Sequence, residues 1–158
     1  MAAPPGSAPP IRPLPHGLLA ALEGEEVIRV SSREGTRSGT VPMWFAVAPP
    51  GVIYLFAHTF SRKVERWRRD PWVRLRPEGG GPAAEGTVRF VDGPELDAVA
   101  ELVVDRWAMA GATTVEALRR MVAEGSHAVL RVEAPEPGAG SDQAAGVPCG
   151  RTISESSS

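Results

Sequence analysis

The chain has 158 residues, of which 42% are hydrophobic and 23% charged, and its formal net charge is −2. These values fit one soluble globular domain and exclude a strongly basic nucleic-acid-binding protein. The apolar runs are far shorter than a membrane span, and the single cysteine, Cys149, cannot form an internal disulfide or a cysteine metal site. We therefore expect a cytoplasmic protein with no bound metal and no membrane or nucleic-acid partner.

The two ends of the chain differ in composition from its middle. Residues 1–13 are rich in Pro, Ala and Gly, and residues 135–158 are rich in Gly, Pro and Ser. Segments with so few periodic apolar residues do not bury enough surface to offset the entropy of ordering. The composition predicts a disordered arm over 1–13, a folded domain over 14–134 and a disordered tail over 135–158.

The first half of the domain contains one helical pattern and three strand patterns. Leu14, Leu18 and Leu22 recur at helical spacing, and Gly24 follows as a C-terminal stop. Runs rich in β-branched and aromatic residues then alternate with Gly- and Pro-containing turns, which indicates antiparallel strands. These strands are predicted over 27–31, 40–48 and 52–58.

In the second half of the domain, the spacing of apolar residues changes from a period of two, typical of strands, to about 3.6, typical of helices, and then back. Ser61 is predicted to cap a short helix that ends at Asp70-Pro71, Asp92 to cap a second helix, and Thr113 with Glu116 to form a capping box for a third. The predicted elements are a helix over 62–69, strands over 72–76 and 84–91, a helix over 94–109, a helix ending before Gly125, and a strand over 127–133.

Six antiparallel strands with short helices predict a mainly β protein with a small closed barrel. The order of the elements is not that of a doubly wound nucleotide-binding fold. The glycine motifs of dinucleotide-binding and P-loop proteins are also missing from the sequence.

The strongest candidate site is the start of the predicted helix 62–69. Ser61, Arg62 and Lys63 lie together at its first turn, where unpaired backbone N–H groups and the helix dipole favour an anion. Lys63 is the only lysine beside sixteen arginines, and lysine offers a phosphate a compact charge. The pattern indicates phosphate binding; the alternative is an exposed amphipathic helix with ordinary surface cations.

Four segments together resemble a known family. They are V-P-M-W-F (41–45), I-Y-L-F-A (53–57), S-R-K-V-E-R-W-R-R-D-P (61–71) and V-R-L (73–75). They are similar to the pyridoxamine 5′-phosphate oxidase-like split-barrel flavin-binding proteins, especially the deazaflavin (coenzyme F-420)-dependent branch. The resemblance covers about residues 15–133. It implies a six-stranded antiparallel split β-barrel that forms a homodimer with cofactor sites at the subunit interface.

The resemblance also implies which residues bind the cofactor. Ser61, Arg62 and Lys63 would hold its phosphate. The ring would lie along Thr40, Val41, Pro42, Met43 and Trp44, largely against backbone groups. Ala57, His58 and Thr59 would border the phosphate and ribityl end. No catalytic residue is implied, and the tail matches none of the substrate-binding residues of the vitamin B6 oxidases.

The function implied is an oxidoreductase that uses reduced coenzyme F-420 to transfer hydride to a small unsaturated or oxidised organic molecule. One alternative is an FMN-dependent oxidoreductase of the same fold, and another is a flavin-binding carrier without turnover. A haem-binding split barrel is less favoured, because no residue stands out as an axial ligand. The arginines Arg66, Arg68 and Arg69 either guide a polyanionic cofactor tail or form an exposed basic face.

Overall fold

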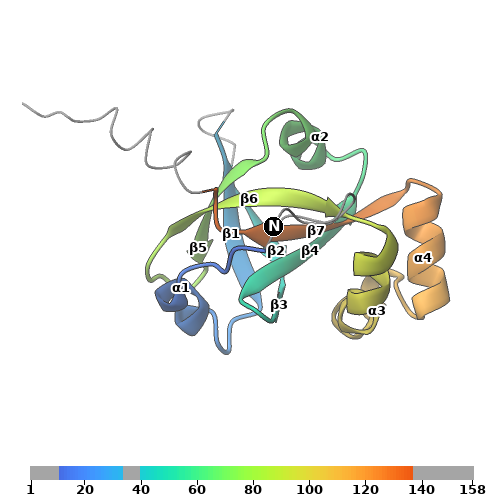
Figure 1. Cartoon of the computed structure of the whole chain (residues 1–158), viewed down its shortest axis with the longest axis horizontal. Coiled ribbons are helices and arrows are strands. Elements are labelled where there is room, and N and C mark those ends of the chain that lie inside the picture. Colours follow the sequence, from blue (N-terminus) through green and yellow to red (C-terminus); the bar gives the residue numbers. More distant parts are fainter. Residues whose placement is uncertain (1–10, 34–39, 137–158) are drawn as a thin grey trace, which may run out of the picture.

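The computed structural model describes residues 11–33 and 40–136 (Figure 1). Its elements are α1 (His16–Ala21), β1 (Val27–Ser32), β2 (Thr40–Trp44), β3 (Ala46–Ala48), β4 (Val52–His58), α2 (Arg62–Arg69), β5 (Trp72–Pro77), β6 (Ala84–Val91), α3 (Gly93–Trp107), a 3-10 turn (Ala108–Ala110), α4 (Val115–Ala123) and β7 (His127–Glu133). The disorder predicted for residues 1–10 and 137–158 concerns segments outside the described residues. In the described ranges no helix has both the length and the apolar character that crossing a membrane requires.

The sheet has seven strands, where the sequence predicted six, in the order β2-β1-β5-β6-β7-β4-β3. The difference lies in the segment 40–48, which was predicted as one strand and is divided at Phe45. Its first part, β2, pairs with β1, and its second part, β3, pairs with β4. Because β2 and β3 stand at opposite ends of the order, this segment joins the two ends of the sheet. The strand is interrupted at the point where its pairing partner changes from β1 to β4.

The interior of the curled sheet holds the first hydrophobic core. In β5, Val73 and Leu75 point into it and Arg74 and Arg76 are exposed, as the predicted alternation requires. Two helices close this core: in Figure 1, α1 lies below the curled sheet and α2 above it. Their buried side chains belong to the same cluster, and Trp67 of α2 is only 1% exposed.

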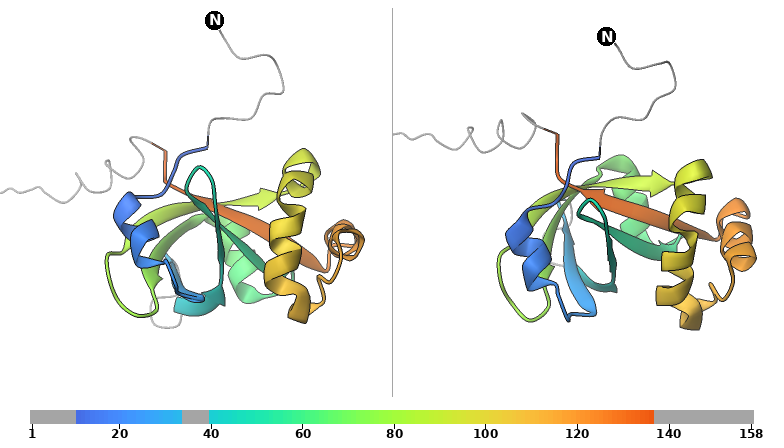
Figure 2. Two further views of the ribbon diagram at one scale, coloured as in Figure 1. Left: turned by 90° about the horizontal axis from the view of Figure 1, so that it is seen from below. Right: turned by 60° about the horizontal axis from the view of Figure 1, so that its bottom comes forward.

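A second core lies on the outer face of β4 and β7. The strand β4 is buried at six consecutive positions because its inward side chains fill the first core and its outward ones, such as Tyr54 and Phe56, pack against helices. Helix α3 contributes Leu96, Val103 and Trp107 to this second core. Figure 2 shows α3 and α4 side by side against this part of the sheet. The continuous apolar run in the sequence therefore marks a strand covered on both faces.

Two predicted helix caps differ in detail from the structure. Asp92 occupies the N-cap position of α3, but its side chain makes no capping hydrogen bond. The cap of α4 is Thr114 and not Thr113: its hydroxyl accepts a hydrogen bond from the amide of Ala117 at 3.0 Å. Adjacent threonines offer the same chemistry, so the sequence pattern did not distinguish between them.

Residues 11–13, assigned by composition to the N-terminal arm, contact the domain. Ile11 packs against the second core, and the carbonyl of Arg12 accepts a hydrogen bond from the amide of Ala134 at 2.9 Å. A chain that starts at residue 14 should therefore melt about 5 °C below one that starts at residue 11, because it loses this bond and apolar burial. Calorimetry on the two chains checks this, and equal melting temperatures would mean that the contacts contribute nothing.

Candidate functional site: an anion pocket at the start of α2

The start of α2 and the beginning of β2 together form a pocket of about 270 Å³. Its lining residues are Val41, Ser61, Arg62, Lys63 and Arg66. The hydrophobic face of α2, with Val64 and Trp67, is fixed in the first core, so its basic face turns outward beside β2. The amphipathic pattern of this helix therefore places the cationic side chains at the pocket.

The pocket carries three positive charges without a compensating carboxylate. Within the described part of the chain, Arg62, Lys63 and Arg66 form no ion pair. Three neighbouring cations repel one another and create a positive local potential, which an anion relieves. The geometry thus supports anion binding more than the alternative of scattered surface cations.

Ser61 occupies the N-cap position, but its hydroxyl does not cap the helix. The Oγ atom donates a hydrogen bond to the carbonyl of His58 at 2.8 Å. No side chain therefore accepts a hydrogen bond from the first-turn N–H groups of α2. These groups form the positive end of the helix dipole. For Ser61 to donate to a phosphate, its hydroxyl proton has to turn away from His58.

Arg66 lines the pocket, although the sequence analysis did not place it with Ser61, Arg62 and Lys63 at the phosphate and left it either to guide a cofactor tail or to form an exposed basic face. The signal was present in the sequence, because residues three and four apart share one face of a helix. Arg66 is three residues after Lys63 and four after Arg62. The spacing alone, once the helix is predicted, places all three cations on one side.

The structure does not bring all predicted residues into this pocket. Met43 and Ala57 point into the first core, so only their backbone groups remain for a ligand. The hydroxyl of Thr40 lies 2.6 Å from that of Ser31, and Pro42 is exposed on the end strand β2.

Trp44 lies at the far end of β2 and is 41% exposed. The guanidinium of Arg106 lies 5.4 Å from its ring centroid. The same guanidinium donates to the carbonyls of Phe45 at 2.9 Å and Glu26 at 2.7 Å. Arg106 therefore ties the last turn of α3 to the β2–β3 break and orients the indole.

His58 and Thr59 face the turn between α4 and β7 instead of the pocket. The amide of Thr59 donates to the carbonyl of Ser126 at 3.0 Å, and its hydroxyl donates to the carbonyl of Gly125. The ring of His58 lies 4.2 Å, centroid to centroid, from that of His127 on the facing strand. These contacts anchor the segment that carries Ser61.

Because His127 is partly buried beside His58, we expect its contribution to the free energy of unfolding to be lost at acidic pH. Burial, and then the charge of His58, lower the pKa of His127 below its ordinary value of about 6.5. The unfolded chain then binds the proton more readily, so this contribution is complete above about pH 6.5 and is lost as the pH falls through the folded pKa. Urea unfolding from about pH 7 to about pH 5 should show a shallower decline for His127→Gln than for the wild type. Parallel declines would contradict this.

The described residues contain no cluster of metal-ligating side chains. In residues 11–33 and 40–136, no group of three or more His, Cys, Asp or Glu side chains is arranged to hold a metal ion.

Comparison with known proteins identifies the fold. No protein-family model and no curated protein matches the chain. Solved structures do match it over about three quarters of its length. One is a candidate pyridoxamine 5′-phosphate oxidase from Listeria innocua, with 17% identity over 75% of this chain and 90% of that one and a TM-score of 0.52.

Two further solved structures match the chain to a similar extent. A FAD-binding protein from Mesorhizobium loti is 16% identical over 74% of this chain and 84% of that one, with a TM-score of 0.50. The haem storage protein HutZ from Vibrio cholerae is 11% identical over 74% of this chain and 87% of that one, with a TM-score of 0.54. The mainly β antiparallel fold is therefore that of the pyridoxamine phosphate oxidase-like proteins. At this identity, and with neighbours that bind different groups, the fold alone does not decide the ligand.

Proposed function

We propose that the chain is a homodimeric oxidoreductase that binds a phosphorylated flavin-type cofactor at the anion pocket. Coenzyme F-420 is the first candidate and FMN the alternative. The observation that supports this most strongly is the convergence of Ser61, Arg62 and Lys63 with Val41 around one pocket. The fold, shared with a FAD-binding protein, supports a flavin-type ligand in particular over an unrelated anion.

In this proposal the residues of the chain bind and orient the cofactor. Ser61, Arg62 and Lys63 hold the phosphate, together with the first-turn amides of α2. The ring lies along β2, where Met43 and its neighbours offer backbone groups and the exposed Trp44 offers an aromatic surface. The bound cofactor supplies the hydride chemistry, which fits a pocket whose lining has no acid–base pair.

The charge of α2 favours the deazaflavin coenzyme over FMN. The helix sequence RKVERWRR carries five basic residues and one acidic residue. FMN brings one phosphate, whereas coenzyme F-420 adds a polyglutamate tail. Arg66, the third cation of the pocket, is placed to meet the first charge beyond the phosphate. The substrate would be a small unsaturated or oxidised organic molecule.

The size of the pocket and the surface beside it support the proposed dimer. A volume of about 270 Å³ is below the range of pockets that enclose a drug-sized ligand, so it holds the phosphate end and leaves the ring outside. Phe60, next to Ser61, is 75% exposed. A second chain that covers the ring and this aromatic side chain would complete the site.

We expect sedimentation velocity at micromolar concentration to give twice the chain mass of 16.7 kDa. An interface that completes two cofactor sites should bury upwards of about 2,000 Å². A stable 16.7 kDa monomer, with and without cofactor, would contradict the homodimer.

The proposal is tested by fluorescence titration of the protein with coenzyme F-420, FMN and riboflavin. Both phosphorylated cofactors should bind more tightly than riboflavin, with coenzyme F-420 the tightest. Equal affinity for riboflavin and FMN would contradict the phosphate assignment. Turnover separates an enzyme from a carrier: a reductase reoxidises many equivalents of reduced cofactor with an acceptor such as cyclohex-2-enone, and a carrier reoxidises none.

A further inference from the structure

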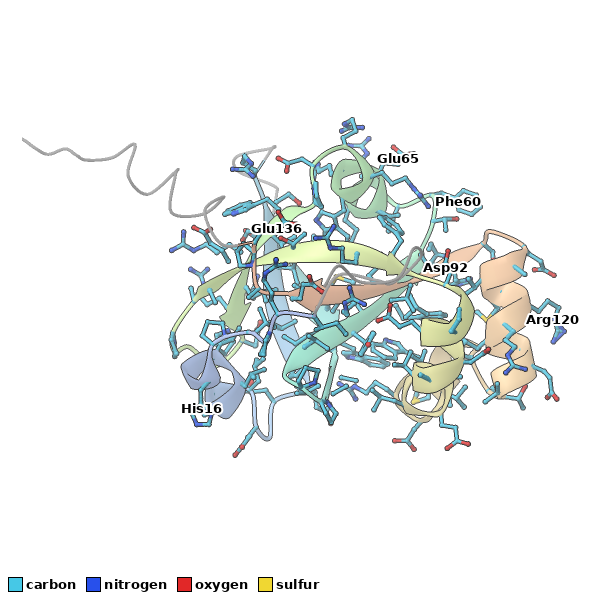
Figure 3. All side chains as sticks on the ribbon, in the orientation of Figure 1. His16, Phe60, Glu65, Asp92, Arg120 and Glu136 are labelled. Atoms are coloured by element: carbon cyan, nitrogen blue, oxygen red, sulfur yellow. The ribbon has the colours of Figure 1, made fainter. Side chains whose placement is uncertain are left out.

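A second pocket, of about 290 Å³, lies beside the last turn of α2. It is built by the segment after β4, the end of α2, the end of β6, and the turn between α4 and β7. Its lining residues include Arg68, Phe90, Asp92, Val122 and His127. It shares no residue with the anion pocket. Figure 3 shows Asp92 at the end of β6, where the chain enters α3.

Arg68 gives this pocket a cation that is held in place but unpaired. Its guanidinium carbon lies 4.4 Å from the ring centroid of Phe90, so one face of the group is fixed by the aromatic ring. Within the described ranges no carboxylate forms an ion pair with Arg68. The edge of the planar fork therefore remains available for a carboxylate.

His127 gives the pocket a hydrogen-bond acceptor. The hydroxyl of Ser126 donates its only proton to the carbonyl of Met121 at 3.1 Å. The same hydroxyl lies 3.0 Å from Nδ1 of His127; when both contacts form together, the hydroxyl accepts in the second one and Nδ1 carries the hydrogen. In the neutral ring the lone pair is then on Nε2. Burial, which lowers the pKa of His127, favours this neutral form.

Asp92 supplies a second acceptor. It is exposed, makes no capping hydrogen bond to α3, and forms no ion pair with a described residue. The pocket therefore combines one cationic fork, two acceptors and an apolar side formed by the half-buried Phe90 and Val122. Such a set complements a ligand with an anionic group and a separate hydrogen-bond donor.

We propose that this pocket binds a single-ring aromatic carboxylate that also carries a hydroxyl or amino group. The carboxylate is held by Arg68, the ring packs beside Val122, and the hydroxyl or amino group donates to Nε2 of His127 or to Asp92. A cavity of about 150 Å³ holds benzene, so a pocket of about 290 Å³ has room for one substituted ring.

The test uses the full chain with ¹⁵N-labelled histidine, because it has three histidines and gives few signals. Without ligand, the His127 signals should be those of the Nδ1–H tautomer. 4-Hydroxybenzoate should shift them saturably, with a Kd of about 1 mM as expected for a ligand of this size. Benzoate lacks the donor and phenol lacks the anion, so each should bind about tenfold more weakly.

Two variants localise the effect. Arg68→Gln should weaken 4-hydroxybenzoate about tenfold, and Arg120→Gln, whose side chain points outward from α4 in Figure 3, should leave it unchanged. The proposal is overturned if no saturable shift occurs at tens of millimolar, if phenol binds as well as 4-hydroxybenzoate, or if Arg68→Gln has no effect. The cofactor titration is read separately, because the two pockets share no residue.

Discussion

Replacement of Lys63 by alanine should weaken cofactor binding by roughly 10- to 150-fold. The change removes a charge-assisted hydrogen bond to the phosphate, worth about 1.5–3 kcal/mol, and each 1.4 kcal/mol is about tenfold in affinity. The fold should be retained, because Lys63 makes no ion pair within the described part of the chain. Fluorescence titration with coenzyme F-420 and with FMN measures the effect.

Two further variants show whether the position of the charge matters. Lys63→Arg keeps the charge but changes its geometry, so its affinity should fall between those of the wild type and Lys63→Ala. Arg120→Ala removes an arginine from the exposed surface of α4 and should leave cofactor affinity unchanged. If Lys63→Ala binds both cofactors as tightly as the wild type, the basic face of α2 is only an exposed surface.

The second large effect concerns stability, at a charge network under the start of α3. Arg131 of β7 is bonded to Glu95 of α3 at 2.5 Å and to Glu133 at 2.8 Å. Tyr54 donates to the same Glu95 at 2.9 Å. The side chain of Glu133 is 3% exposed and that of Arg131 is 13% exposed.

Burial and the Glu95 carboxylate raise the pKa of Tyr54. For Arg131 burial acts against the charge, but the two carboxylates outweigh it and raise its pKa. The positive charge of Arg131 and the negative charges of Glu95 and Glu133 therefore stabilise one another, and the Arg131 guanidinium contacts both carboxylates.

Arg131→Met should lower the free energy of unfolding by about 3 kcal/mol. It leaves Glu95 without its cation and leaves the buried Glu133 with only the more distant Arg89, whose Nε lies 3.7 Å away. Urea unfolding at neutral pH measures this. Glu95→Gln introduced into that variant should restore part of the loss.

The matched control is Arg119→Ala, which breaks the ion pair with Asp97 on the surface, where the two side chains are 53% and 58% exposed. That change should cost less than about 1 kcal/mol. If Arg131→Met costs no more than Arg119→Ala, the buried network does not stabilise the fold.

Much of the fold could be predicted, because most elements carry their own periodic pattern. The alternation of Trp72–Pro77 and the apolar run of Val52–His58 correspond to β5 and β4. The break at Phe45 could not be predicted, because it depends on which strands the two halves of 40–48 pair with. Which strands pair depends on how distant segments assemble in the sheet, so it leaves no local signal.

The candidate site was predictable to the extent that one helix carries it. Ser61, Arg62 and Lys63 are adjacent in sequence, and the helical period adds Arg66. The second pocket gave no such signal, because Arg68 and His127 lie on segments that are far apart along the chain. The tautomer of His127 depends on a hydrogen bond between Ser126 and Met121, which only the folded turn creates.

The most direct measurement of the central claim uses the fact that Lys63 is the only lysine of the chain. Protein labelled with ¹⁵N-lysine gives one side-chain amine signal, which reports this single site. Coenzyme F-420 and FMN should each shift that signal saturably, whereas riboflavin, which has the ring but no phosphate, should leave it in place. If neither phosphorylated cofactor moves the Lys63 signal, or if riboflavin moves it equally, the pocket at the start of α2 does not bind the cofactor phosphate.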